Sequence, residues 1–334
     1  MMPAVHNLKP LSTARPIAAS DASGSATVGL VTDLLLRPDL LRRGMSEDDV
    51  RRALRTGEIA PLRPGAYLDA TDPRWRDADE RHRALTEATY AQLAPGAVVS
   101  HVSAAVRHRL PVWGVPLGTV HISRDRRSGG RAGRRLRSYA TSLASDEIVL
   151  VDGLPTTSVA RTVVDVARST PFETAVAIAD AALHTEVVDA HELAAAVLAA
   201  GGRRGAGRAR SVIAFADARA DGPGESRARV RMDVLGVAHP VLQHRFDDAR
   251  GRHVGTVDFW WPREGIIGEF DGMEKYGRSL RPGEKLGDAV MREKRREDAL
   301  RAQPGVRTVV RWTWDEIADF DAVAARLPQV TRAS

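Results

Sequence analysis

The stretch that decides the C-terminal fold is Val257-Asp258-Phe259-Trp260-Trp261-Pro262-Arg263-Glu264-Gly265-Ile266-Ile267-Gly268-Glu269-Phe270-Asp271. Two apolar runs, rich in β-branched and aromatic residues, flank a short turn-forming link. They predict two strands, over residues 254–261 and 265–271, joined as a hairpin. Adjacent strands would bring Asp258 and Glu269 close together, and paired carboxylates at strand ends suit a hard cation.

Three further elements surround this hairpin. The sequence predicts a helix from Glu225 to Leu235, with Glu225 in its first turn, and a charged helix from Gly283 to Ala302. A last strand is expected from Val306 to Thr313. The predicted order is therefore helix, strand, strand, helix, strand.

Five ordered blocks in this part carry a resemblance to a known family. They are Glu225-Ser226-Arg227, Val257 to Pro262, Gly268 to Gly272, Arg292 to Arg296, and Val309 to Trp312. Together, from Glu225 to about Ile317, they resemble the PD-(D/E)XK endonuclease-like domain related to very-short-patch repair endonucleases. The resemblance implies a mixed β-sheet flanked by helices.

The same resemblance implies a metal site. Carried over by position, Glu225, Asp258 and Glu269 would be ligands of Mg²⁺ or Mn²⁺, and the metal would activate a water for hydrolysis of a DNA phosphodiester. The family's lysine, two residues after the second acid, is Asp271 here. Lys275, or Lys294 from the following helix, would then supply the cation, so the candidate catalytic residues are Glu225, Asp258, Glu269, Asp271 and Lys275.

Three interpretations of these acids stay open. The domain is an active nuclease, or it is retained for DNA binding or protein contact without catalysis, which the missing lysine favours. In the third, Asp258 and Glu269 are solvated strand-end acids and Glu225 merely suits a helix N-terminus through the dipole. Acids inside apolar strands carry a burial cost unless they are paired or metal-bound, and this cost argues against the third interpretation.

The N-terminal part reads as two helices and a hairpin. Val28 to Leu36 predicts a short helix that Arg37-Pro38-Asp39 interrupts. Ser46-Glu47-Asp48-Asp49 predicts the capped start of a second helix, which Gly57 ends. Residues 58–68 alternate around Pro64-Gly65 as a small hairpin would. Helix, helix, hairpin is the order of a winged helix.

Basic residues of this module are candidate DNA contacts. Arg51, Arg52 and Arg55 lie on the second helix, where some would face a groove or phosphates. Arg63, on the wing, would meet backbone phosphate. The alternative is an amphipathic helix with a solvated basic face. The loop from Arg124 to Arg137, rich in arginine and glycine, is either a phosphate-binding arm or a solvated connection.

A second resemblance covers the N-terminal half. The matching stretches are Val50 to Ile59, Leu62 to Tyr67, Ser103 to Pro111, and Gly153 to Asp165. They resemble the AbiEi-type antitoxins, transcriptional regulators of type IV toxin-antitoxin systems. This resemblance implies a non-catalytic DNA-binding regulator, with a cognate toxin or a second copy of the chain as partner.

Composition narrows the remaining classes. The 334 residues carry a net charge of +6, which favours a polyanionic partner such as DNA. Cysteine is missing from the sequence, so thiol chemistry and disulfides are excluded, and a cytoplasmic location is expected. Residues 1–25 lack a secretory apolar core and are expected to form a disordered tail, and no apolar run suits a membrane helix. Without paired spacing, the histidines are expected in the core or on the surface rather than on a metal.

These observations predict an α+β protein with a winged helix-turn-helix, a helical middle domain and a PD-(D/E)XK-like mixed sheet. The expected boundaries are a tail over 1–25, the winged helix over 26–75, an AbiEi-like middle domain over 76–210, and the endonuclease-like domain over 222–330. The leading hypothesis for function is a DNA-binding protein with a metal-dependent endonuclease-like domain. The alternative is an AbiEi-like antitoxin that regulates transcription without catalysis.

Overall fold

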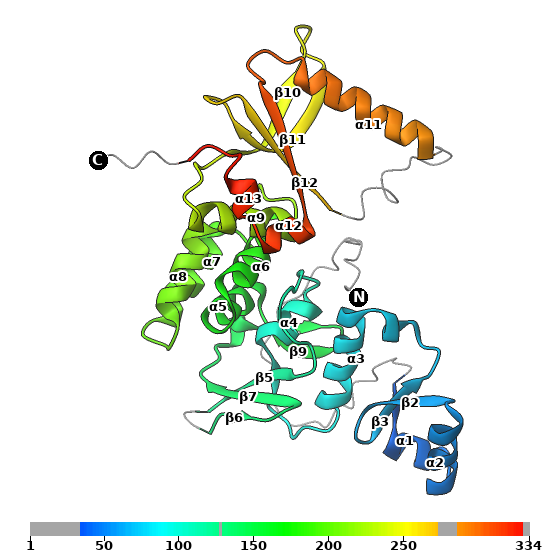
Figure 1. The fold of residues 1–334 in the computed structure, drawn as a ribbon. Helices are drawn as coiled ribbons and strands as arrows, with labels where there is room; N and C mark the ends of the chain where they lie inside the picture. Colours follow the sequence, from blue (N-terminus) through cyan, green and yellow to red (C-terminus); the bar gives the residue numbers. More distant parts are fainter. Residues whose placement is uncertain (1–33, 127–128, 273–285, 330–334) are drawn as a thin grey trace. The chain divides into compact units, whose positions relative to one another are not determined.

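The computed structural model describes residues 34–126, 129–272 and 286–329. It confirms the mixed α+β class, with helices and several sheets (Figure 1). Two compact units divide the chain: one runs to Thr170 and includes Val188–Arg210, and the other holds Pro171–Val187 and the chain from Ser211 onward. In the described ranges no helix has both the length and the apolar character to cross a bilayer. The domain boundaries expected from the sequence remain predictions.

The first unit opens with a small helical module on a three-stranded sheet of order β1-β3-β2. Its elements are β1 (Leu35–Leu36), α1 (Arg37–Arg42), α2 (Glu47–Thr56), β2 (Ile59–Arg63) and β3 (Ala66–Asp69). The helix expected at Ser46 is confirmed, because the Ser46 hydroxyl accepts from the Asp49 N–H and the Asp49 carboxylate accepts from the Ser46 N–H. Gly57 ends α2 at φ 74°, a conformation glycine adopts freely. Leu40, Val50 and Tyr67 form the core of the module.

The start of this module corrects the sequence prediction. Pro38 was expected to interrupt a helix, but it stands in the first turn of α1, where its missing N–H has no intrahelical partner to lose. Leu35 and Leu36, placed in a helix by the prediction, form a strand instead. The earlier part of that predicted helix, from Val28, lies outside the described residues.

The middle of the first unit is a six-stranded sheet of order β6-β7-β5-β4-β9-β8. The prediction of a helical middle domain was therefore incomplete, because this part also contains a sheet. The strands and the helices around them are η1 (Pro73–Arg76), α3 (Ala78–Tyr90), β4 (Val98–Val99), α4 (His101–Arg107), β5 (Val120–Asp125), β6 (Arg131–Ala132), β7 (Leu136–Thr141), η2 (Ser145–Glu147), β8 (Ile148–Val151), β9 (Leu154–Thr157), α5 (Val159–Ser169) and α7 (Ala190–Ala200). Leu62 of β2 packs against the Leu85 cluster of α3 and this sheet, so the small module shares a core with it.

The second unit holds a four-stranded sheet of order β10-β11-β12-β13. Its elements are α6 (Phe172–His184), α9 (Pro223–Val234), β10 (Val241–Asp247), β11 (His253–Trp261), β12 (Ile266–Asp271), α11 (Leu286–Arg301), β13 (Thr308–Thr313), α12 (Trp314–Ala318) and α13 (Asp321–Ala324), while α8 (Ala206–Phe215) crosses the boundary between the units. The first three strands are antiparallel, and β13 pairs parallel to β12 through α11. The predicted hairpin and both flanking helices are confirmed, and β10 was missed.

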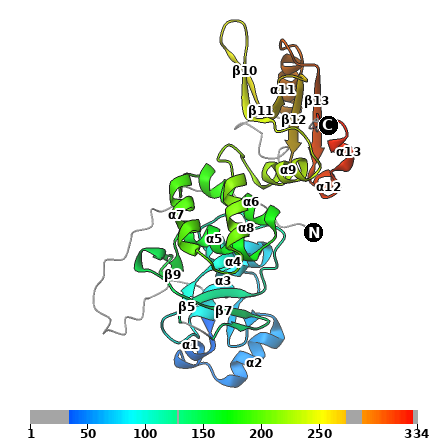
Figure 2. The same ribbon diagram turned by 90° about the vertical axis from the view of Figure 1, so that its left-hand side faces the viewer.

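Each face of this sheet has its own core. On one face, Phe259, Trp261 and Trp312 pack with residues of α9, α12 and α13. On the other, Val257 and Ile267 pack against Leu300 of α11. Figures 1 and 2 both show α11 running beside the sheet.

Candidate functional site

The arginines expected to read DNA are exposed on α2, but two of them are already paired. Val50 and Ala53 are buried, so the opposite face of α2 carries Arg51, Arg52 and Arg55. Arg51 lies 2.5 Å from the Asp48 carboxylate and Arg52 2.7 Å from that of Asp49. Within the described part of the chain Arg55 forms no such pair. It is therefore the guanidinium of α2 that is most available to a phosphate.

Arg63 lies on the predicted hairpin, next to its turn. It is the last residue of β2 and is half-buried. Its Nε is buried and has no hydrogen-bond partner among the described residues. Burial, and then the nearby Arg135 guanidinium, lower the pKa of Arg63. Two like charges therefore face each other where β2 meets the central sheet.

The stretch predicted as a basic loop, Arg124 to Arg137, contains β6 and the start of β7, which form a hairpin. Arg131, Arg134, Arg135 and Arg137 are all exposed, and none of them forms an ion pair within the described ranges. Arg137 lies over the Tyr139 ring, 5.3 Å from its centroid. This hairpin therefore carries more uncompensated positive charge than α2, where Asp48 and Asp49 neutralise two arginines.

Two buried histidine groups lie in the core of the same unit. The His82 Nδ1 is 2.7 Å from the Leu117 carbonyl oxygen, so it must be the protonated nitrogen that donates. Its Nε2, 2.8 Å from the Ser103 hydroxyl, is then the acceptor. Burial lowers the pKa of His82 to about 4. His82 is thus a neutral core histidine, as the sequence analysis expected of its histidines.

The second group centres on Tyr139. The His101 ring stacks on Tyr139 at 3.6 Å between centroids, and the His121 Nδ1 is 3.0 Å from the Tyr139 hydroxyl. Burial lowers the pKa of His101 to about 4 and of His121 to about 3, and raises that of Tyr139 to about 12. All three rings are therefore neutral near pH 7.

Glu225 and Asp258 are brought together, as predicted. Glu225 lies in the first turn of α9 and is buried, and its Oε2 accepts from the Asp221 N–H at 3.0 Å and from the Gln243 amide at 2.9 Å. The same amide lies 3.5 Å from Asp258 Oδ1. Burial, and then the Asp258 carboxylate, raise the pKa of Glu225 well above its usual range. Gln243 was not singled out from the sequence.

The Asp258 side chain also takes the place of a backbone hydrogen bond between β11 and β12. The pairing of β11 with β12 ends at Phe259 and Gly268. Beyond this point Asp258 Oδ2 accepts from the Phe270 N–H at 2.8 Å. Phe270 in turn packs on Gly224 of α9, where any side chain would collide with its ring at about 2.0 Å. The close approach of α9 to β12 therefore requires glycine at this position.

Glu269 is held by arginines instead of joining the pair. Its Oε1 accepts from Arg296 of α11 and its Oε2 from Arg311 of β13, each at 2.8 Å. Since Ile267 packs toward α11 and side chains alternate along a strand, Glu269 faces α11, whereas Glu225 belongs to α9 on the opposite face. Burial lowers the pKa of Arg311, but the Glu269 carboxylate and then that of Asp271 raise it, so Asp271 belongs to the same charged group. Lys275 lies outside the described residues.

No cluster of three or more His, Asp or Glu side chains able to hold a metal ion occurs among the residues that the structure describes. The geometry there is a carboxylate pair bridged by an amide on one face, and an arginine-clamped glutamate on the other. Arg296 and Arg311 lie in the sequence blocks that resemble the endonuclease-like family, but nothing in the sequence indicated that they would pair with Glu269.

The match to a known family falls mainly within the first unit and extends into the second. Residues 88–215 match the family model of the AbiEi antitoxin C-terminal domain. The uncharacterized proteins MT2308 and Rv2248 of two Mycobacterium tuberculosis strains are each 34% identical over 165 residues, which cover 46% of this chain and 59% of theirs. The chain thus matches somewhat more than half the length of these relatives. The crystal structure of the RV2827C protein from Mycobacterium tuberculosis aligns with 60% of this chain and 76% of its own, at 16% identity and a TM-score of 0.37, too low to support a statement about fold.

Proposed function

We propose that this chain is a non-catalytic, DNA-binding regulator of the AbiEi antitoxin type. The observation that carries the proposal is the match of residues 88–215 to the AbiEi antitoxin C-terminal domain. The match favours the regulatory alternative over the endonuclease hypothesis.

The DNA contact would use the small module before that domain. The α1–α2 pair and the β2–β3 hairpin place Arg55 on an exposed helix face. Phosphate contacts from such arginines supply affinity that does not depend on sequence, and base contacts supply specificity. The winged-helix identity of the module is part of this proposal, and the β6–β7 arginines extend the basic surface of the same unit.

Fluorescence anisotropy tests the DNA proposal, with a duplex from the chain's own promoter and an unrelated duplex of equal length. Arg55→Ala should weaken binding and reduce the slope of log affinity against log salt by about 1, the value for one lost phosphate contact. Arg51→Ala should cost less, because Asp48 already pairs with Arg51 and makes it less available to a phosphate. Arg250→Ala, an exposed arginine of the second unit, is the charge-matched control. Equal affinity of all three variants and the wild type would move the contact away from α2.

The antitoxin part of the proposal needs a separate test. A neighbouring gene for a nucleotidyltransferase-like toxin would be co-expressed with this chain, and growth would be recorded with each gene alone and with both. Rescue of growth by the full chain supports the proposal. Toxicity unchanged by the chain, with DNA binding intact, would leave a regulator that is not an antitoxin.

A second candidate function, DNA cleavage, is favoured by one observation: Glu225 and Asp258 converge on one amide. The third ligand that the PD-(D/E)XK resemblance implies does not fit, because both oxygens of Glu269 accept from arginines. We therefore derive no catalytic step. Mg²⁺- or Mn²⁺-dependent cutting of supercoiled, linear or mismatched DNA that is lost in Asp258→Ala would establish the nuclease, and binding without cutting would leave the regulator.

A further inference from the structure

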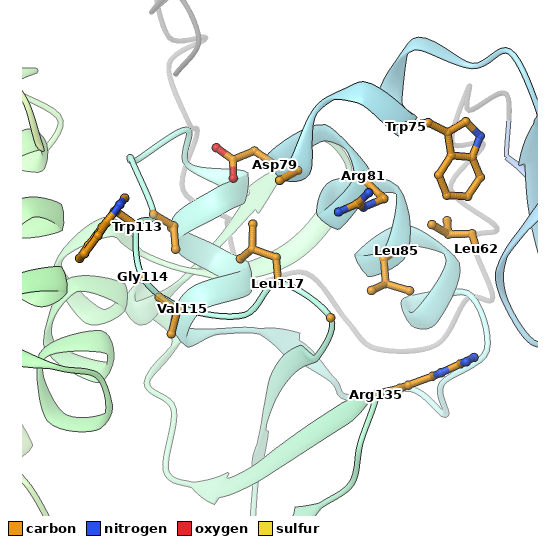
Figure 3. A pocket seen from close by; sticks show the side chains of 13 residues that line it. Leu62, Trp75, Asp79, Arg81, Leu85, Trp113, Gly114, Val115, Leu117 and Arg135 are labelled. Carbon is orange, nitrogen blue, oxygen red and sulfur yellow. The ribbon is translucent and has the colours of Figure 1, made fainter. Parts of the chain in front are cut away.

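A pocket of about 450 Å³ lies in the first unit, where the small module meets the central sheet (Figure 3). Its walls come from β2, η1, α3, the loop between α4 and β5, and the residue before β7. The side chains that matter for its chemistry are Leu62, Trp75, Asp79, Arg81, Leu85 and Arg135. Pockets that enclose small organic ligands usually measure about 300–1,000 Å³, so this one is large enough for a single such molecule.

The walls are largely apolar and include aromatic surface. Leu62 and Leu85 extend the buried cluster beneath the sheet, so this side of the pocket is anchored in the core. The Trp75 indole is fixed by its Nε1, which donates to the Asp69 carbonyl oxygen at 2.9 Å. Figure 3 shows Trp75 and Leu62 at one end of the lining and Trp113 at the other. Such surfaces favour a flat, apolar ligand body.

The walls carry two arginines, Arg81 and Arg135, and one acid, Asp79, so positive charge is in excess. Arg81 and Arg135 are exposed, and neither forms an ion pair within the described ranges. Arg63, next to Leu62 in the chain, adds a third guanidinium, half-buried and close to Arg135. Like charges held together in this way repel one another unless an anion lies near them. The pocket is therefore complementary to a molecule with a flat body and a negative group.

We propose that this pocket binds a small aromatic anion, a carboxylate or a phosphate ester, and that the ligand is an effector of DNA binding. The effector role rests on the proposed function. A ligand in the pocket touches Leu62 of the β2–β3 hairpin and Leu85 of α3 together, so it bears on how the small module packs against the rest of its unit. If DNA binding changes the affinity of the pocket for the ligand, the ligand changes the affinity for DNA by the same factor.

Titration calorimetry on the full chain tests the site with two anionic probes, adenosine 5′-monophosphate and indole-3-carboxylate. Adenosine and indole serve as their uncharged counterparts. At least one anion should bind, and Arg81→Ala and Arg135→Ala should each weaken it about tenfold, the loss expected when a charge-assisted hydrogen bond is removed. Arg76→Ala, an exposed arginine of η1 outside the lining, should keep wild-type affinity. Which anion binds distinguishes a nucleotide from an aromatic carboxylate.

Three results would overturn the site: neither anion binds at millimolar concentration, the uncharged counterparts bind as tightly, or both arginine variants bind like the wild type. Melting curves of the variants exclude misfolding as the cause of lost binding. The effector role is tested by repeating the DNA titration with saturating ligand. Unchanged DNA affinity refutes that role but leaves the site. Absence of any DNA binding refutes the proposed function, and the calorimetric result stands on its own.

Discussion

Acid should destabilise the first unit, and His82 supplies a calculable share of the effect. His82 is 1% exposed, and its pKa lies at about 4 in the folded chain against an ordinary value of 6.5. Protonation would place a second N–H against the Ser103 hydroxyl, which already accepts from the His121 N–H at 2.8 Å. The hydroxyl proton would then lose its acceptor, so the charged ring is disfavoured by its neighbours as well as by burial.

The sign follows from proton binding. Below pH 6.5 His82 of the unfolded chain binds a proton, whereas His82 of the folded chain binds one only near pH 4. The stability due to neutral His82 is therefore fully present above pH 6.5 and is lost as the pH falls toward 4. With these two pKa values, the cost is a few tenths of a kcal/mol at pH 7 and about 2 kcal/mol at pH 5. His101 and His121 add to the loss with the same sign.

The assay is urea unfolding of the full chain at pH 7 and pH 5, followed by hydrogen exchange in peptides of α3, which report on the first unit. His82→Gln removes the titrating group, so its stability should fall by about 2 kcal/mol less than that of the wild type between the two pH values. The variant also starts lower at pH 7, because hydrogen bonds are lost. His191→Gln, on an exposed position of α7, is the matched control. An identical pH dependence of wild type and His82→Gln would refute the reasoning.

Three further predictions concern the second unit. Burial and Asp258 raise the pKa of Glu225, so the folded chain keeps a proton that the unfolded chain releases as the pH rises above 4.5. The Glu225→Gln variant should therefore have a higher melting temperature than the wild type at pH 8 but not at pH 4. Glu269→Gln removes the charge shared by Arg296 and Arg311 and should cost about 3 kcal/mol in urea unfolding followed by tryptophan fluorescence; a cost below about 0.5 kcal/mol would mean that the clamp is not formed. Gly268→Ala would set a Cβ 2.7 Å from the Trp312 ring and 3.0 Å from that of Trp261, so the same assay should show a loss of about 1–3 kcal/mol, and an unchanged midpoint would contradict this packing.

The parts of the fold that could be predicted are those with local causes. The start and end of α2 follow from the Ser46–Asp49 capping box and from Gly57, each acting within a few residues. The β11–β12 hairpin follows from two apolar runs and a short link. The strand β7, Leu136–Thr141, was missed, because none of its residues is fully buried and it lacks a clear apolar face.

β10 was missed for a more specific reason. Leu242 and Phe246 are four residues apart and would share a face in a regular strand, yet they belong to the cores on opposite faces of the sheet. The change of face occurs at Gln243, which has a φ of 50° and is left out of the pairing between β10 and β11. Across from it, Val257 and Phe259 also belong to opposite cores. A strand that changes face midway has no alternation for a sequence pattern to detect.

The same irregularity decides what the acids of the second unit can do. The Gln243 amide donates to Glu225 and lies 3.5 Å from Asp258, so it bridges the two carboxylates. Glu269 stands on the next strand but on the α11 face, and its charge is matched by two guanidiniums. The resemblance to the endonuclease-like family implied three ligands, and a position along the chain does not tell to which face each side chain points. A pair of carboxylates that keeps its proton and a clamped glutamate are arrangements that hold a sheet together.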